Sequence, residues 1–314
     1  MRMTVTMTIG LVLSGLLQDP SPAADLSAVV AAGAKLQRVV DQCRFTEGPA
    51  ADAAGNVYFT DQPNDRIVRI GIDGTVSDFM KPAGRSNGMF FGPDGKLIAC
   101  ADEQNQMWEI DVTDRSHNVL FDQYQRSRLN GPNDVWVHPN GVMYFTDPFY
   151  KRPWWKHSEP PQAVQSLYRV ERDRLTIHRE PEPFKQPNGI VGDAKRRLLF
   201  VADIGDKKTY SYPIQDDGVL GRRTLFCEEG SDGMTLDDSG HLYLTGKSGV
   251  TVFQADGSRL GVIEVPENWT ANVCFGGPDQ RTLFITASDS VYTIAMRTRG
   301  ISDQRNSESP IDVE

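Results

Sequence analysis

The stretch EGPAADAAGNVYFTD, residues 47–61, contains the pattern that decides the fold of this chain. It combines a short apolar strand, a turn rich in Asp, Ala and Gly, and a second strand that includes residues 57–60. Five later segments repeat the pattern, and they begin at Asn87, Asn133, Asn188, Asp232 and Asn272. Successive units begin 40–55 residues apart, which is a period typical of propeller blades or of helical repeats.

The strand patterns within each unit favour a propeller over helical repeats. Further short strands follow the repeated pair, for example in a hairpin that turns at Asp73-Gly74. We therefore predict an all-β chain folded as a six-bladed β-propeller. The last unit lacks an outer strand, and we expect residues 35–43 to supply it and so close the ring. A two-sheet sandwich is the alternative, but it gives no reason to repeat one phrase six times.

Composition and charge limit the class of protein and its partners. The chain has 39% hydrophobic residues, 28 Gly and 19 Pro, which suits a turn-rich globular protein. Its formal net charge of −9 argues against a nucleic-acid partner. Four cysteines stand far apart at 43, 100, 227 and 274, so neither a zinc site nor a disulfide is expected.

The ends of the chain differ from its middle. Residues 1–24 combine one Arg with a short apolar run and small residues suited to cleavage, which predicts a signal peptide and a secreted or periplasmic protein. A disordered extension is the alternative. No other segment is apolar enough to cross a membrane, so no membrane association is expected. We divide the chain into a signal peptide (1–24), a propeller domain (35–297) and a polar C-terminal tail (298–314).

Every repeat unit opens with a side chain that carries an oxygen atom. The first strand of a propeller blade is its innermost strand, so these side chains should converge at one end of the central channel. A hard cation would satisfy them. A mixture of amide and carboxylate oxygens points to calcium, with magnesium less suited and another divalent cation as the alternative. The alternative is that Asn and Asp only shape turns, which explains Glu47 poorly. The opening residues are Glu47, Asn87, Asn133, Asn188, Asp232 and Asn272.

The phrases FTEGPAAD, NGPNDVWVHPNGVMYFTDP, PNGIVGD and SDGMTLDDSGHLYLT resemble those of the SMP-30/gluconolactonase/LRE-like family, in particular its bacterial gluconolactonases. The resemblance covers residues 36–296 and implies a six-bladed propeller with calcium in its channel. It implies metal ligands at Glu47, Asn133, Asn188 and Asp232, of which Asn133 acts partly through water or substrate. It also implies that Asp232 is the acid/base residue. Asn87 and Asn272 match no ligand position of the family.

Members of this family mostly hydrolyse lactones, and some relatives hydrolyse phosphotriesters. The resemblance therefore implies a calcium-dependent hydrolase that opens a small-molecule sugar lactone by metal-polarised attack of water. Asp232 would act as a general base or, alternatively, as a nucleophile. An organophosphate triester hydrolase at the same metal, and a non-catalytic propeller that binds a ligand, remain as alternatives. The motif GRSNG at 84–88 is followed by a strand pattern instead of a helix, which argues against a serine hydrolase.

An insertion at residues 148–166 lengthens the third unit. The connection that it extends should lie at the same end of the channel as the opening residues, so we expect it to form a wall over the metal. Its aromatic side chains suit a sugar ring, and Lys151 and Arg152 suit a carboxylate or a polyol. The alternative is that its aromatics pack on the blade below. We predict substrate-binding roles for Tyr150 and Trp154, and for Arg128 in the segment that leads into the third unit.

Overall fold

The computed structural model describes residues 25–301. The predicted signal peptide and residues 302–314 of the predicted tail lie outside the described residues. Between residues 25 and 301 the regular structure consists of strands and two 3-10 helices, η1 (Leu26–Ala28) and η2 (Gln62–Asn64). Neither is long and apolar enough to cross a membrane. All four cysteines belong to the described part, and they are free.

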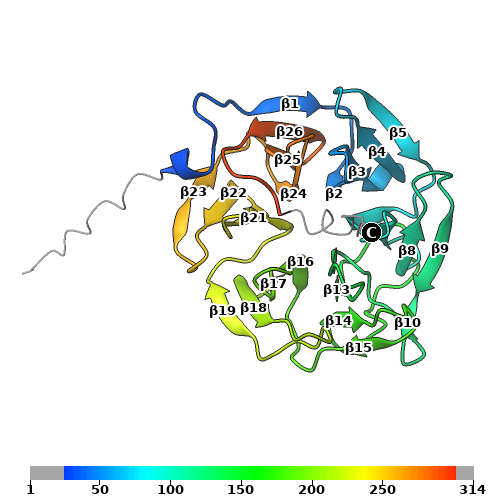
Figure 1. Ribbon diagram of the computed structural model, residues 1–314. Coiled ribbons are helices and arrows are strands. Elements are labelled where there is room, and N and C mark those ends of the chain that lie inside the picture. Colours follow the sequence, from blue (N-terminus) through cyan, green and yellow to red (C-terminus); the bar gives the residue numbers. More distant parts are fainter. Residues whose placement is uncertain (1–24, 302–314) are drawn as a thin grey trace, which may run out of the picture.

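Six antiparallel sheets of four strands surround a central axis (Figure 1), which confirms the predicted six-bladed propeller. Blade 1 contains β2 (Thr46–Ala51), β3 (Val57–Asp61), β4 (Arg66–Ile70) and β5 (Val76–Met80). Blade 2 contains β6 (Ser86–Phe91), β7 (Leu97–Ala101), β8 (Gln106–Ile110) and β9 (His117–Phe121). Blade 3 contains β12 (Val135–Val137), β13 (Met143–Asp147), β14 (Ser166–Val170) and β15 (Ile177–Arg179).

The second half of the ring has the same construction. Blade 4 contains β16 (Pro187–Asp193), β17 (Leu198–Asp203), β18 (Lys208–Pro213) and β19 (Thr224–Cys227). Blade 5 contains β20 (Met234–Leu236), β21 (Leu242–Gly246), β22 (Gly249–Phe253) and β23 (Arg259–Ile263). Blade 6 contains β24 (Thr270–Gly276), β25 (Thr282–Ala287), β26 (Ser290–Ala295) and β1 (Gln37–Val40). A small hairpin, β10 (Gln123–Tyr124) and β11 (Ser127–Arg128), lies between blades 2 and 3.

The N-terminal strand closes the ring as predicted. Strand β1 pairs antiparallel with β26, and it becomes the outermost strand of a blade whose other three strands come from the far end of the chain. Closure of this kind leaves only short sheet edges exposed. After β26 the chain stays attached to the propeller, because the backbone N–H of Ile301 donates to the carbonyl oxygen of Leu236.

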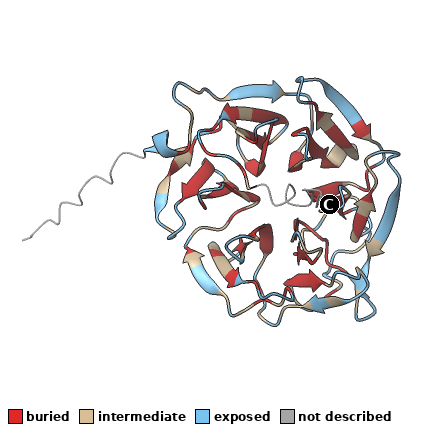
Figure 2. Cartoon of the chain, viewed as in Figure 1, coloured by how far each residue is buried: buried red, intermediate tan, exposed pale blue. Residues whose placement is uncertain are grey.

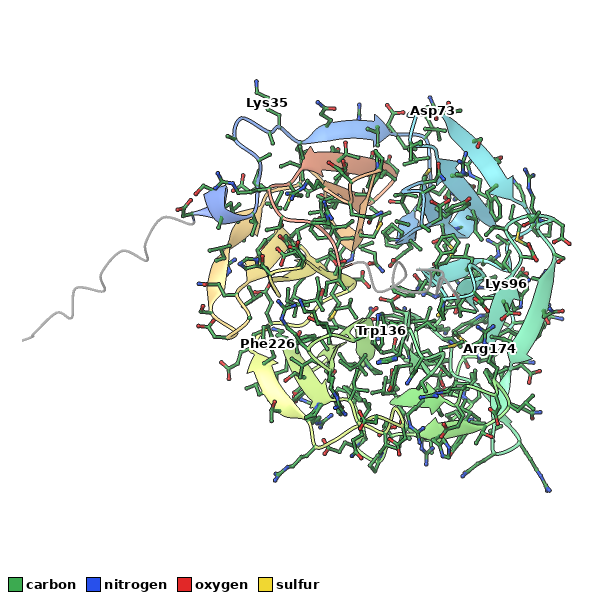
Figure 3. The ribbon with its side chains drawn as sticks, viewed as in Figure 1. Lys35, Asp73, Lys96, Trp136, Arg174 and Phe226 are labelled. Carbon is green, nitrogen blue, oxygen red and sulfur yellow. The ribbon has the colours of Figure 1, made fainter. Side chains whose placement is uncertain are left out.

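Burial increases from the rim of the ring toward its axis (Figure 2). The outer strands β5 and β9 are mostly exposed, whereas the inner strands of the same blades are almost entirely buried. Figure 3 shows Lys35, Asp73 and Lys96 toward the rim, and Trp136, which is 1% exposed, near the centre. The apolar core therefore lies between neighbouring blades, where the inner strands come together.

A threonine that recurs in the second strand of several units links neighbouring blades. The Thr60 hydroxyl donates to the backbone oxygen of Asn87 (3.2 Å), and the Thr146 hydroxyl donates to that of Asn188 (2.8 Å). In blade 5 the Thr245 hydroxyl donates to the backbone oxygen of Ala271 (2.7 Å). Each bond crosses from one blade to the inner strand of the next, so the repeated Thr fixes the position of residues that open the following unit.

The dipeptides that open three of the units lie within inner strands, and the turn interpretation fails for them. Glu47-Gly48 lies within β2, Asn87-Gly88 within β6 and Asn188-Gly189 within β16, at places where the strand register shifts. Gly48 has a φ of +41°, and a Cβ there would lie 2.1 Å from the backbone oxygen of Asn87. Glycine is therefore required where the next blade approaches closely.

Candidate active site

A cavity opens at the end of the channel where the inner strands begin, and we call it the mouth cavity. Glu47, Asn87, Asn133 and Asp232, four of the six opening residues, line it. Asn188 reaches it through hydrogen bonds to two of its lining residues. The remaining lining residues are Phe45, Tyr150, Arg152, Gln186, Ile204 and Trp269.

Two carboxyl groups share the mouth cavity, and both have raised pKa values. Glu47 is 4% exposed, and its pKa is well above the usual range because of its burial and, next, because of the nearby charge of Asp232. Asp232 is partly exposed to the cavity. Loss of hydration raises its pKa to about 6, although hydrogen bonds from Trp269 and Asn188 act in the opposite direction. The positive charge of Arg152 already lowers both pKa values, and a cation in the cavity would lower them further.

Hydrogen bonds hold Asp232 at both of its carboxylate oxygens. The amide nitrogen of Asn188 donates to its Oδ1 over 2.7 Å, and the indole N–H of Trp269 donates to its Oδ2. The backbone N–H of Asp232 itself donates to the carbonyl oxygen of Thr245 on the neighbouring strand β21. The orientation of this carboxylate is therefore fixed by blades 4, 5 and 6 together.

The residues around the cavity fit a hard cation. The Asn188 amide nitrogen donates to Asp232 and to the Tyr150 hydroxyl, which leaves the Asn188 Oδ1 buried and without a hydrogen-bond partner. Such an acceptor is costly unless it has a partner, and a cation could be one. Within residues 25–301 no three His, Cys, Asp or Glu side chains gather to hold a metal. A cation here would thus need amide oxygens beside the two carboxylates, as Ca²⁺ accepts.

The insertion forms part of the cavity wall, but it also packs on the neighbouring blade. Tyr150 and Arg152 line the cavity. The Trp155 indole N–H donates to the backbone oxygen of Asp102 in blade 2 (2.7 Å), and the Trp155 ring stacks on His157. The packed aromatics of the loop therefore anchor it, and the anchored loop presents Tyr150 and Arg152 to the cavity.

The structure does not bring Arg128 or Trp154 to the mouth cavity. Arg128 lies exposed on the β10–β11 hairpin, whose position depends on packing between blades 2 and 3 instead of on the repeat. Trp154 lies under the guanidinium of Arg85, whose Cζ is 4.8 Å from the ring centroid. The chain turns at residues 153–154, where the backbone N–H of Trp155 donates to the carbonyl oxygen of Arg152, so Arg152 lines the cavity and Trp154 does not.

Sequence reasoning did not single out Trp269, and it left Arg152 among general candidates. Trp269 lies in the loop before β24, outside the repeated phrase, so the repeat contained no signal for it. Asn272, the sixth opening residue, does not line the mouth cavity, because its Oδ1 accepts from the backbone N–H of Val273 deeper in the channel.

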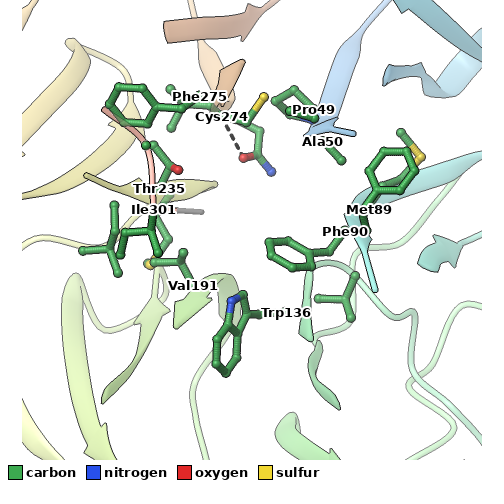
Figure 4. A pocket seen from close by; sticks show the side chains of 18 of the residues that line it. Pro49, Ala50, Met89, Phe90, Trp136, Val191, Thr235, Cys274, Phe275 and Ile301 are labelled. Carbon is green, nitrogen blue, oxygen red and sulfur yellow. Dashed lines mark hydrogen bonds between the residues drawn. The ribbon is translucent and has the colours of Figure 1, made fainter. Parts of the chain in front are cut away.

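A second cavity, which we call the apolar cavity, follows the mouth cavity along the channel. Side chains from all six blades surround it, among them Phe90, Trp136, Val191 and Phe275 (Figure 4). Two carboxylates line it, Asp52 and Asp134. Asp52 accepts from the backbone N–H groups of residues 54 and 56, and Asp134 accepts from those of residues 135 and 190. The carboxylates of the apolar cavity therefore already have backbone partners, and the mouth cavity is the better candidate.

Buried acids should make the stability of the metal-free protein depend on pH. Burial raises the pKa of four Asp residues to about 6 or 7, namely Asp102, Asp134, Asp147 and Asp232. Between pH 4 and 7 the folded chain then holds more protons at these groups than the unfolded chain does. A rise in pH through this window therefore favours unfolding. Acids with lowered pKa values, such as Asp111 and Asp206, act only below this window.

We expect the thermal midpoint in a chelating buffer to fall by about 5–10 °C from pH 5 to pH 8, since about 1 kcal/mol corresponds to a few degrees. Two histidines with lowered pKa values act in the opposite direction, but the four carboxyl groups outnumber them. Differential scanning calorimetry over this range is the measurement, and Asp232→Asn should show a shallower slope. A midpoint that rises steadily with pH would contradict this account.

Comparison with known proteins adds a family and several relatives. The family model described as SMP-30/Gluconolactonase/LRE-like region matches residues 45–289. A gluconolactonase of Zymomonas mobilis is 29% identical over 305 residues, covering 88% of this chain and 85% of that protein. Pentonolactonase XacC of Haloferax volcanii is 27% identical over 262 residues, covering 80% and 84%. The structure of a gluconolactonase from Xanthomonas campestris has a TM-score of 0.79 at 28% identity, covering 87% and 92%.

Proposed function

The chain belongs to the SMP-30/gluconolactonase/LRE-like family, and from this premise we propose that it hydrolyses a sugar lactone in the mouth cavity with the help of a divalent cation. One observation carries the proposal: Glu47 and Asp232 share a cavity with amide groups at the end of the channel. A propeller that only binds a ligand has no need for two carboxyl groups whose burial is costly. The lactonase names of the relatives support the same reaction.

The proposed cation is Ca²⁺, held by Glu47, Asn133, Asn188 and Asp232, although other divalent cations could occupy the site. Two carboxylates would balance its charge, and the unpaired Asn188 Oδ1 would gain a partner. When bound, the cation would act as a Lewis acid on the lactone carbonyl.

The side chains of the cavity supply the remaining requirements of hydrolysis. Asp232 accepts the proton of the attacking water, and the hydrogen bonds from Asn188 and Trp269 fix the direction in which it does so. Tyr150 donates no hydrogen bond within the described part of the chain, so its hydroxyl proton is available to the substrate while its oxygen accepts from Asn188. The insertion covers one side of the cavity and limits the access of bulk water.

A substrate screen tests this proposal. The purified protein should hydrolyse aldonolactones faster than buffer alone, lose that activity in excess chelator and regain it with Ca²⁺, as followed by proton release. Hydrolysis of phosphotriesters with no lactone hydrolysis would favour the organophosphate hydrolase instead. Lactone binding without turnover, with and without added divalent cations, would favour the non-catalytic propeller and overturn the proposal.

We also propose that residues 1–24 direct export and are then removed. The support is the sequence pattern alone, with a short apolar run followed by small residues. Fractionation of cells that express the full chain, with N-terminal sequencing of the product, tests this. A cytoplasmic protein that retains residues 1–24 would contradict it.

A further inference from the structure

Arg152 enters the mouth cavity from the insertion with much of its hydrogen-bonding capacity unused. Its Nε lies 2.9 Å from Asp102 Oδ2. Its Cζ lies 5.2 Å from the centroid of the Tyr150 ring and 5.8 Å from that of the Trp154 ring. Within residues 25–301 neither terminal nitrogen of Arg152 donates a hydrogen bond. A guanidinium is planar and carries four N–H bonds on these two nitrogens, so it can form paired hydrogen bonds with a ligand.

Asp102 makes different hydrogen bonds from the Asp residues at the same position of three other blades. A carboxylate ends the second strand in blades 1, 3 and 4, and each accepts from two consecutive backbone N–H groups in the loop that leads into its own blade. Asp61 accepts from residues 44 and 45, Asp147 from 130 and 131, and Asp203 from 185 and 186. Asp102 accepts from no backbone N–H group in the described chain, because Asp65 accepts from residues 83 and 85 instead.

The Asp102 carboxylate, which has no backbone N–H partner in the described chain, forms an ion pair with Arg152. It is 1% exposed, and its Oδ2 also accepts from the Gln62 amide at 3.1 Å. Trp155, three residues after Arg152, donates to the backbone oxygen of the same Asp102. The insertion is thus fastened to Asp102 of blade 2 at Arg152 and again at Trp155, and the guanidinium is oriented before any ligand arrives.

We propose that Arg152 recognises hydroxyl groups of a neutral polyhydroxy lactone, and that Asp102 is the positioning residue that orients it. This inference rests on the proposed function and names its substrate class. Asp102 balances the charge of Arg152, and Glu47 and Asp232 would balance that of a divalent cation. The mouth cavity therefore has no surplus positive charge for an anionic lactone, whereas the two terminal nitrogens suit the oxygens of neighbouring hydroxyls.

Substrate analogues test the assignment directly. We expect Arg152→Met to lower kcat/KM for a neutral aldonolactone by roughly 10–100-fold, the value of one or two charge-assisted hydrogen bonds. For the single-deoxy analogue that lacks the contacted hydroxyl, the same substitution should have almost no effect. For analogues that lack other hydroxyls, Arg152→Met should lower kcat/KM by the same factor as for the parent lactone. Equal losses for every analogue, or no loss at all, would overturn the assignment.

Matched variants separate recognition from damage to the fold. Arg85→Met removes the other guanidinium that lies over Trp154, and Arg85 does not line the mouth cavity. Any loss of activity in this variant should therefore be the same for the parent lactone and for every deoxy analogue. Asp102→Asn should weaken the same hydroxyl preference, and the double variant with Arg152→Met should lose no more than Arg152→Met alone. Thermal midpoints of all variants identify any that fail to fold, and Arg152→Lys then provides the second test because it keeps the charge without the paired geometry.

The charge argument has its own test. The wild-type protein should hydrolyse a neutral aldonolactone more efficiently than the matching lactone with a carboxylate in place of its terminal CH₂OH group. The opposite preference, abolished in Arg152→Met, would overturn the neutral-substrate inference. A wild-type protein that hydrolyses no lactone would reject the proposed function itself, whereas an active wild-type enzyme matched by Arg152→Met on every analogue would reject only the role of Arg152.

Discussion

Asp232→Asn is expected to lower kcat for lactone hydrolysis by roughly 10²–10⁴-fold, the usual contribution of a general base. The amide keeps the shape of the side chain and an oxygen at one position, but it can take no proton from water. It also replaces an acceptor of the Trp269 and Asn188 hydrogen bonds, so its orientation becomes ambiguous. Steady-state rates at saturating lactone, with Ca²⁺ varied up to saturation, measure the loss.

The Ca²⁺ series distinguishes the two tasks assigned to Asp232. Loss of one carboxylate should weaken cation binding, since the number of charged ligands tunes such affinities. If Asp232 is also the base, kcat stays low when the cation saturates. Full recovery at high Ca²⁺ would show that Asp232 only binds the cation and that the base lies elsewhere. Asp238→Asn, an exposed Asp of the same blade, serves as the matched control and should keep wild-type rates.

The repeat made much of this site predictable from sequence. Inner strands of a propeller start at the same end of the channel, so residues at one position of the repeat must converge there. Glu47 and Asp232 do lie in one cavity, with Asn133 and Asn188 close by. The same reasoning placed Asn272 in the ring, but its side chain bonds to the backbone N–H of the next residue. Position along the strand is thus predictable, whereas the direction of a side chain at a strand irregularity is not.

Residues outside the repeat could not be placed in the same way. The direction of Arg152 depends on Asp102, which is 50 positions earlier in the chain, and this contact exists because Asp65 takes over the bonds that Asp102 would otherwise accept. Arg128 precedes the third unit closely in sequence, yet a hairpin directs it to the surface. Such contacts depend on distances between blades and on loop conformation, and no periodic pattern encodes either of them.

The closure of the ring by the N-terminal strand, in contrast, could be predicted by counting the strands of each unit. Removal of that strand is expected to have the largest effect on stability. A chain that begins at residue 42 should lose at least 10 °C of thermal midpoint or fail to remain soluble, compared with a chain that begins at residue 25. Truncation removes β1 and exposes the edge of β26 to solvent and to other chains. It also removes Val29, which is fully buried in the core between blades 5 and 6 and by itself contributes about 1.5–3 kcal/mol.

Backbone contacts add to the cost of this truncation. The N–H of Arg297 donates to the carbonyl oxygen of Val29 (2.7 Å), and the N–H of Ala31 donates to that of Ala295 (3.1 Å). Each such bond contributes about 0.5–1.5 kcal/mol, and the polar groups left on β26 would need water or another chain as partners. Calorimetry together with size-exclusion chromatography measures both effects. Equal midpoints and a monomeric truncated chain would show that three strands suffice for blade 6, and that pairing with the N-terminal strand does not hold the ring closed.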